Sequence, residues 1–265
     1  VHAVFRDRRF GREVPAEMAR KLPGHLAAFD AVERHSLLEA EPPRHTRLRG
    51  LVLRAFTSRR IGALKPEIAA LAHDLIDGFP DGPFDLLPAY CTQIPVIVIA
   101  RLLGVPDSMA PDLLRWSHAM VAMYEAGRTE ATEHAAASAA RAFADFLRGY
   151  VEERRTRPAD DLITQLIAAE EAGEKLSTDE LIATCILLLN AGHEATVHAL
   201  GNGVKTLLET GTSAQALDPE GIDRTVEEIL RFDPPLHMFT RYAYEPVEIG
   251  GQALARGDQI ALMLG

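Results

Sequence analysis

One expected helix constrains the fold of this chain more than any other feature of the sequence. The motif STDE at residues 177–180 is a capping box that starts this helix, and Gly211 follows its expected end. About 33 residues at about 1.5 Å each give a length of roughly 50 Å, which is enough to cross a whole domain. The middle of the helix, residues 186–189, is apolar nearly all round, which indicates burial at the centre of the protein.

The rest of the chain predicts further helices and then a short β-rich segment. Amphipathic patterns continue up to residue 233, and alternating apolar residues follow, with turns at residues 250–251 and 256–258. We therefore expect a mainly α fold with a small β-element, in one large domain or two small ones. The helical body would cover about residues 1–233 and the β-element about residues 240–265.

Composition and charge exclude several classes of partner. The formal net charge of −10 over 265 residues argues against nucleic acid as a partner. No apolar run is long enough to cross a bilayer, so we expect no membrane association. Cys91 and Cys185 are the two cysteines of the chain; they make no disulfide framework and fit a reducing, cytoplasmic location.

The stretch LLLNAGHEATVHALGNG, residues 187–203, interrupts the long apolar helix with polar and small residues. The segment HEATVH within it suggests a zinc hydrolase at first sight. A zinc helix of that kind needs two histidines four residues apart, so that both imidazoles lie on one face. His193 and His198 are five apart, which turns them about 140° from each other and argues against this class.

One face of the same helix consists of small residues. Starting from Gly192 and stepping about 100° per residue, Cys185, Ala199 and Gly203 lie within roughly 20° of it. Glycine inside a helix costs about 1 kcal/mol relative to alanine, so we expect something to come close to the backbone here. Another helix and a large flat ligand are both open alternatives, and spacing alone slightly favours the helix. Glu194 beside this face also needs an explanation, because a buried acid is costly without a partner.

Four motifs in order give the chain a resemblance to cytochrome P-450 monooxygenases of the soluble bacterial type. NAGHEAT, residues 190–196, resembles the A-G-x-[DE]-T motif of that family's central helix, and EEILR contains its E-x-x-R pair. EPPRHTRLRGLVLRAFT resembles the family segment with a His and an Arg four residues apart, and PPLHMFTRYA the segment that follows E-x-x-R. Each motif is weak alone, but the resemblance runs over the whole chain and the motifs follow the family's order.

The resemblance implies that residues 1–265 form a single, incomplete cytochrome P-450 domain with a heme b cofactor, and it gives several residues a role. The parent protein would be a heme-thiolate monooxygenase that uses dioxygen and two electrons to oxidise an apolar small molecule. Glu228 and Arg231 would form a structural ion pair that supports the heme-binding core; the alternative is a surface salt bridge three residues apart, which differs mainly in burial. His45, Arg49 and Arg241 would bind the heme propionates. Ala191 and Gly192 would lie against the heme. The expected substrate-pocket residues are Leu236, His237, Met238 and Phe239.

The catalytic segment departs from the family pattern at one position. The family's acid and threonine would occupy Glu194 and the next residue, which is Ala195 here. Thr196 follows one residue later, about 100° further around the helix, so it need not replace the missing hydroxyl. Glu194, Ala195 and Thr196 are the expected catalytic segment, with protons delivered by ordered water, a substrate hydroxyl or Glu194.

The second departure concerns the iron ligand. In the resembling family a cysteine in a Gly-rich loop well after E-x-x-R ligates the iron, and this chain ends before such a loop. Neither Cys91 nor Cys185 is expected to replace it, so we expect no iron ligand in this chain and read both of its ends as truncated. The alternative function is a degenerate, non-catalytic helical ligand-binding protein that has lost its thiolate.

A basic segment at residues 44–60 suggests a docking surface. It contains six arginines and no Asp or Glu, in a chain that is acidic overall. In the resembling family this segment borders the face where a redox protein docks, and an acidic ferredoxin-type electron donor would be steered to it. We assign Arg54, Arg59 and Arg60 to docking, with a solvated helix face as the alternative.

Overall fold

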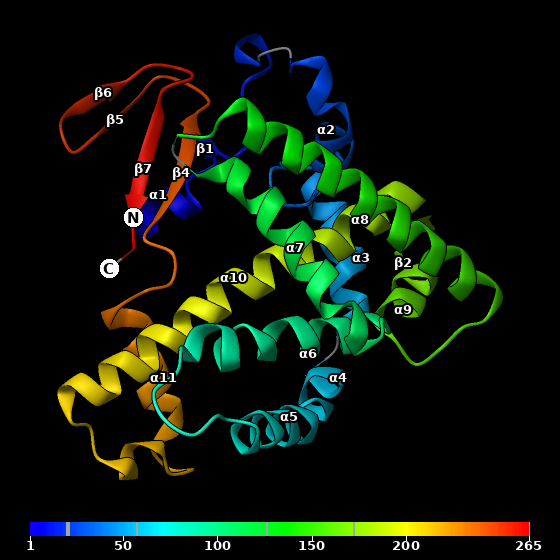
Figure 1. Ribbon diagram of the computed structural model, residues 1–265. Helices are drawn as coiled ribbons and strands as arrows, with labels where there is room; N and C mark the ends of the chain where they lie inside the picture. The colour runs from blue at the N-terminus through cyan, green and yellow to red at the C-terminus, as the bar shows by residue number, and fades with distance from the viewer. Residues whose placement is uncertain (20–21, 57, 126, 172, 265) are drawn as a thin grey trace. The chain divides into compact units, whose positions relative to one another are not determined.

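The computed structural model describes residues 1–19, 22–56, 58–125, 127–171 and 173–264, with the side chains of all of these but 58–60 and 170–171. The described chain is mainly helical with a few short strands (Figure 1), which confirms the predicted class. It divides into two compact units, one within residues 21–194 and the other comprising 1–20 and 195–265. This division does not test the expectation of a single domain, which stays a prediction.

The larger unit is a helical body built around α8. The helices of this unit are, in chain order, η2 (Gly24–Leu26), α2 (Ala27–Glu33), α3 (Arg44–Ala55), α4 (Ser58–Ala63), α5 (Lys65–Asp77), the π-helical turn η3 (Leu87–Cys91), α6 (Gln93–Leu103), η4 (Asp107–Met109), α7 (Ala110–Val121), η5 (Ala122–Tyr124), α8 (Glu130–Thr156), α9 (Leu162–Ala168) and the first half of α10 (Thr178–Thr210). A two-stranded ribbon of β2 (Glu170–Glu171) and β3 (Glu174–Lys175) precedes α10.

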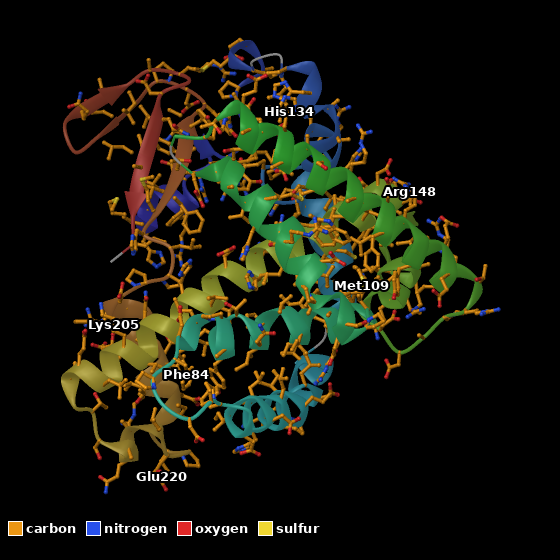
Figure 2. The ribbon with its side chains drawn as sticks, in the orientation of Figure 1. Phe84, Met109, His134, Arg148, Lys205 and Glu220 are labelled. Carbon is orange, nitrogen blue, oxygen red and sulfur yellow. The ribbon has the colours of Figure 1, made fainter. Side chains whose placement is uncertain are left out.

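Small and aromatic side chains of α8 let α7 and α2 pack closely against it. Ala136 and Ala140 are fully buried, and one further turn along Phe143 stacks on Trp116 of α7 with 5.3 Å between ring centroids. Further along the same helix is Arg148, which Figure 2 labels. Its guanidinium pairs with Asp179 at the start of α10, at 2.8 Å. The core of this unit therefore consists of helix-to-helix contacts.

A buried ion pair links the end of α8 to the start of α9. Asp161 is 2% exposed; it accepts a hydrogen bond from Arg154 and caps α9 by accepting from the Thr164 backbone N–H at 2.8 Å. Arg154 also donates to the Gly104 carbonyl at 3.1 Å. Gly104 has φ +80°, and a Cβ there would lie 2.2 Å from the Asp161 carboxylate, so this position needs glycine.

The long helix α10 has the predicted start and length. Its cap is the predicted box: the Glu180 backbone N–H donates to Ser177 Oγ at 3.2 Å, and the Ser177 N–H donates to Glu180 Oε2 at 2.9 Å. Burial alone would raise the pKa of the Glu180 carboxyl, but hydrogen bonds from Arg47 and from the Ser177 N–H outweigh it and lower that pKa. The helix ends before Gly211, which has φ +62°. Of the residues predicted to be buried, 186–189, Ile186 and Leu189 are buried and Leu187 and Leu188 are half-buried, and burial extends back to residue 181.

The smaller unit contains the predicted β-element and its surrounding helices. These elements are α1 (His2–Arg6), β1 (Phe10–Gly11), η1 (Ala16–Met18), the second half of α10, η6 (Ala214–Leu217), α11 (Ile222–Phe232), β4 (Met238–Ala243), β5 (Val247–Ile249), β6 (Gln252–Leu254) and β7 (Gln259–Met263). An antiparallel sheet has the order β1-β4-β7, and β5 and β6 form a hairpin that turns at Gly250 and Gly251. Strand β1, which pairs Phe10 with Ala243, is too short to be visible in the sequence pattern. Among the described helices, none is both long and apolar enough to cross a bilayer.

Candidate functional site

The expected catalytic acid lies in a cluster of three polar side chains. Helix α10 contributes His193 and Glu194, and α7 contributes His118. The His118 Nε2 atom is 3.2 Å and the His193 Nδ1 atom 3.8 Å from the same carboxylate oxygen, Glu194 Oε1. One ligand atom from each residue lies within 4.8 Å of the other two. His193 is 1% exposed, whereas the side chains of Glu194 and His118 are 25% and 52% exposed, so the cluster reaches from the core to solvent.

Sequence reasoning missed His118. It identified Glu194 from its motif and weighed His193 against His198, which lie on the same helix. The residue that joins the cluster comes from α7, and no spacing within α10 points to it. The angle between His193 and His198 on α10 still prevents these two histidines from sharing an ion. His118 is not subject to that angle, because it belongs to α7.

The small-residue face of α10 contacts side chains of other helices at two of its glycines. A Cβ at Gly192 would lie 2.9 Å from Ile99 Cδ1 of α6, and a Cβ at Gly203 would lie 3.2 Å from two atoms of Ile229 in α11. At both glycines, a neighbouring helix therefore approaches the small-residue face, as one of the two alternatives predicts. In each case the contact is made by one isoleucine. Ala191 is exposed and Gly192 half-buried, and their expected contact with a flat cofactor stays a prediction.

The residues after the acid differ in exposure. Ala195 is half-buried and Thr196 is exposed, which agrees with the turn of about 100° between consecutive residues of a helix. Thr196 therefore does not share the environment of Ala195. The hydroxyl that the family pattern has at the half-buried position is missing from this chain.

Two of the expected propionate-binding residues lie one turn apart on α3. His45 is half-buried and Arg49 is exposed, while Leu48, Leu51 and Val52 bury the other face of the helix. Within the described part of the chain, the side chains of His45 and Arg49 have no hydrogen bond, ion pair or ring contact. An imidazole and a guanidinium without other partners are the donors that a carboxylate accepts well. This donor set therefore fits the propionates of a heme.

Arg241, the third expected propionate ligand, lies in the smaller unit on β4. Its Nη1 atom donates to the Thr240 carbonyl at 2.8 Å, and its guanidinium lies over the Phe5 ring at 4.9 Å. The neighbouring Phe239 packs edge-on against the same Phe5 ring, with 6.3 Å between the centroids. The other three expected pocket residues, Leu236, His237 and Met238, are exposed, and the role of all four stays a prediction.

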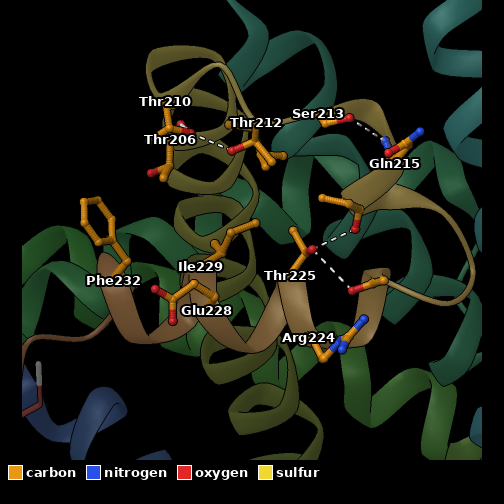
Figure 3. A pocket seen from close by; sticks show the side chains of 13 residues that line it. Thr206, Thr210, Thr212, Ser213, Gln215, Arg224, Thr225, Glu228, Ile229 and Phe232 are labelled. Atoms are coloured by element: carbon orange, nitrogen blue, oxygen red, sulfur yellow. Dashed lines mark hydrogen bonds between the residues drawn. The ribbon is translucent and has the colours of Figure 1, made fainter.

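The ion pair that the E-x-x-R spacing allows is present on α11. Arg231 donates to both carboxylate oxygens of Glu228, at 2.6 and 2.7 Å. These hydrogen bonds lower the pKa of Glu228 and raise that of Arg231. Both side chains are more than half exposed. Glu228 also lines an open pocket of about 640 Å³ between the end of α10, η6 and α11 (Figure 3).

The exposed side of the basic segment is only partly described. Arg54 on α3 is exposed, whereas the side chains of Arg59 and Arg60 lie outside the described residues. Two other arginines of the segment have structural contacts, since Arg47 pairs with Glu180 and Arg44 donates to the Arg34 carbonyl.

Neither cysteine has the character of a metal-binding thiolate. Cys185 is fully buried on α10, and burial raises the pKa of its thiol to about 12. Burial also raises the pKa of the Cys91 thiol, at the end of η3. Metal ligation by cysteine needs the thiolate, and both environments favour the thiol.

Comparison with known proteins identifies the family, although no family model matches the chain. The chain is 41% identical over 233 residues to vitamin D(3) 25-hydroxylase of Pseudonocardia autotrophica, covering 84% of this chain and 55% of that protein. It is 36% identical over 270 residues to the polyketide biosynthesis cytochrome P450 PksS of Bacillus subtilis, covering 99% of this chain and 65% of that protein.

Solved structures agree with the curated relatives. The crystal structure of P450BioI in complex with hexadec-9Z-enoic acid ligated acyl carrier protein matches 99% of this chain and 68% of its own, with a TM-score of 0.91 and 28% identity. The structure of PksS matches 99% of this chain and 65% of its own, with a TM-score of 0.86 and 34% identity. The fold is thus that of bacterial heme-thiolate proteins.

The chain belongs to the cytochrome P450 family. It spans 55% of the length of the vitamin D(3) 25-hydroxylase and 65% of the length of PksS. Heme b is the cofactor of this family, and we expect it in the full-length protein. The donor set on α3 fits the heme carboxylates.

Proposed function

We propose that the full-length protein is a heme-thiolate monooxygenase that uses dioxygen and two electrons to oxidise an apolar small molecule. The observation that supports this most is the agreement of two independent features. The chain matches cytochromes P450 over almost all of its length, and its central helix has an acid, Glu194, to which the motif resemblance gives the place of the family's catalytic acid. The alternative, a non-catalytic ligand-binding protein, would keep the first feature and have no use for the second.

In this proposal His45, Arg49 and Arg241 bind the heme propionates, and Ala191 and Gly192 lie against the heme. Among the described residues, the side chains of His45 and Arg49 have no hydrogen bond or ion pair. This supports the first assignment, because N–H donors from two residues one turn apart can bind one carboxylate. When bound, the heme supplies dioxygen activation. The Glu228–Arg231 pair keeps its proposed structural role on α11.

Glu194 holds and transfers protons in the proposed reaction. Its carboxylate is a quarter exposed and is fixed by His118 at 3.2 Å, so it is oriented and still reachable by water. Ala195 has no hydroxyl to relay a proton, and exposed Thr196 lies about 100° further around the helix. We therefore assign the relay to Glu194 together with ordered water or a substrate hydroxyl.

The substrate is proposed to be an apolar molecule that contacts Leu236, His237, Met238 and Phe239. Three apolar side chains and one imidazole suit a guest with little polar surface. Names of similar proteins support the same class: one is a vitamin D(3) hydroxylase, and CYP109E1 from Bacillus megaterium is described in complex with testosterone. A location in the cytoplasm is part of the proposal.

Electrons are proposed to come from an acidic ferredoxin-type donor that docks on the docking arginines, Arg54, Arg59 and Arg60. The exposure of Arg54 supports this assignment. Opposite charges raise the association rate and make it depend on salt.

The test uses the full-length protein with heme. A carbon monoxide difference spectrum should show thiolate-ligated iron, and substrate should be oxidised at the expense of reducing equivalents. Replacement of both His45 and Arg49 by Ala should lower heme occupancy, because charge-assisted hydrogen bonds are worth about 1.5–3 kcal/mol each. His73→Ala with Arg141→Ala is the matched control, since both side chains are exposed and lie outside α3. A spectrum without the thiolate signature, together with no turnover on any apolar substrate, would favour the non-catalytic alternative.

A further inference from the structure

We propose that His118, His193 and Glu194 form a binding site for a divalent transition-metal ion, with Zn²⁺ as the ion that fits best. Two imidazoles and one carboxylate are a common zinc-binding set that leaves a fourth position for water. The heme iron of this family needs a thiolate, which this set of ligands does not offer.

The distances fit one small ion. Zinc bonds of about 2.0–2.2 Å at tetrahedral angles put neighbouring ligand atoms roughly 3.3–3.6 Å apart. The His118 Nε2 and His193 Nδ1 atoms lie 3.2 and 3.8 Å from Glu194 Oε1, and all three ligand atoms lie within 4.8 Å of one another. Small side-chain rotations would therefore complete the geometry without moving a helix.

The arrangement of the helices makes this convergence possible. Neighbouring residues of a helix diverge by about 100°, so two consecutive ligands rarely suffice. His193 uses Nδ1, the ring nitrogen nearer the backbone, which keeps it close to the Glu194 carboxylate. His118 then approaches from α7, with its ring centroid 5.4 Å from that of His193 and the rings tilted by 55°.

Burial and access also suit an exchangeable ion. His193 is 1% exposed and is held by the core, whereas the His118 side chain is 52% exposed. An ion can therefore enter from solvent on the His118 side and meet ligands that are already in place. Imidazole nitrogens favour zinc, copper or nickel, whereas magnesium and calcium prefer oxygen ligands.

The ion would have a functional consequence, which rests on the proposed role of Glu194. A carboxylate that coordinates zinc no longer accepts and releases protons in the same way. Zinc should therefore lower turnover of the full-length enzyme. Chelation of the ion should restore it.

Zinc binding is tested directly on the full-length protein with heme, by calorimetry and by competition with a chromophoric chelator. Wild type should bind one Zn²⁺ at this site, and His118→Ala and Glu194→Gln should each weaken binding at least about tenfold, since even outer-shell changes cost 10–100-fold in metal affinity. His73→Ala removes an exposed histidine outside the cluster and should leave binding unchanged. Millimolar Mg²⁺ should not compete.

The outcomes separate the two proposals. Equal zinc affinity in wild type, His118→Ala and Glu194→Gln would overturn the metal site, as would the absence of saturable binding in wild type. Circular dichroism and heme content confirm that each variant is folded, and the exposed position of His118 makes its replacement mild. Zinc binding that depends on His118 but leaves turnover unaffected would establish the metal site. It would contradict only the proposed role of Glu194 in proton transfer.

Discussion

Replacing Gly192 by Ala separates the two explanations for the small-residue face of α10. The new methyl group would lie 2.9 Å from Ile99 Cδ1, the far end of a flexible side chain. Turning Ile99 away costs about 0.5–1.5 kcal/mol, and alanine gains about 1 kcal/mol over glycine inside a helix. The two terms nearly cancel, so the free energy of unfolding should change by less than about 1 kcal/mol. If Gly192 lies against the heme as proposed, heme occupancy should nevertheless fall, because the added methyl group would crowd the heme.

The measurement is urea unfolding of the full-length protein, together with its heme content per chain. Ile99→Val serves as the matched background, since valine lacks the Cδ1 atom that the new methyl meets. In that background Gly192→Ala should stabilise the fold by about 1 kcal/mol, the helix-propensity term alone. A loss of more than about 2 kcal/mol in both backgrounds would contradict the packing argument. Unchanged heme occupancy would show that Gly192 does not lie against the heme.

Three further predictions concern the cap, the relay and the docking surface. Folding lowers the pKa of Glu180 below its ordinary value, so the stabilisation from this carboxylate is fully present above that ordinary value and is lost as pH falls through the folded-state pKa; urea unfolding of Glu180→Gln should show less of this acid dependence than wild type. Ala195→Thr should keep the fold and change the fraction of reducing equivalents that ends in product, while Thr196→Ala should do little; uncoupling by Thr196→Ala as strong as that by Glu194→Gln would contradict the helical-phase argument. Charge reversal at the docking arginines should slow electron transfer from an acidic ferredoxin and weaken its salt dependence, with substrate affinity unchanged; an unchanged rate and salt slope in stopped-flow measurements would mean a merely solvated surface.

The elements that the sequence predicts well are those whose signals are local and redundant. Helix α10 has a capping box, a long apolar middle and a terminal glycine, and each of these indicates the same helix independently. The hairpin of β5 and β6 is likewise predicted by a local signal, the two consecutive glycines of its turn, Gly250 and Gly251. Strand β1 has only two residues and exists because β4 offers an edge to pair with, so its formation depends on tertiary contacts that no local pattern contains.

The candidate site also contains one residue that local sequence predicts and one that depends on tertiary packing. Glu194 is recognisable because its motif lies within one helix, where spacing alone fixes which residues are neighbours. The contact of Glu194 with His118 is not, because His118 reaches it only through the packing of α7 on α10, and an isolated histidine on an amphipathic helix has no distinguishing context in sequence. The angle between two side chains around a helix axis can show that two histidines of one helix do not share an ion, as it does for His193 and His198. It cannot exclude a third that another helix brings to the same carboxylate, and in this chain that third residue turns a buried imidazole and an acid into a set of ligands with metal-binding geometry.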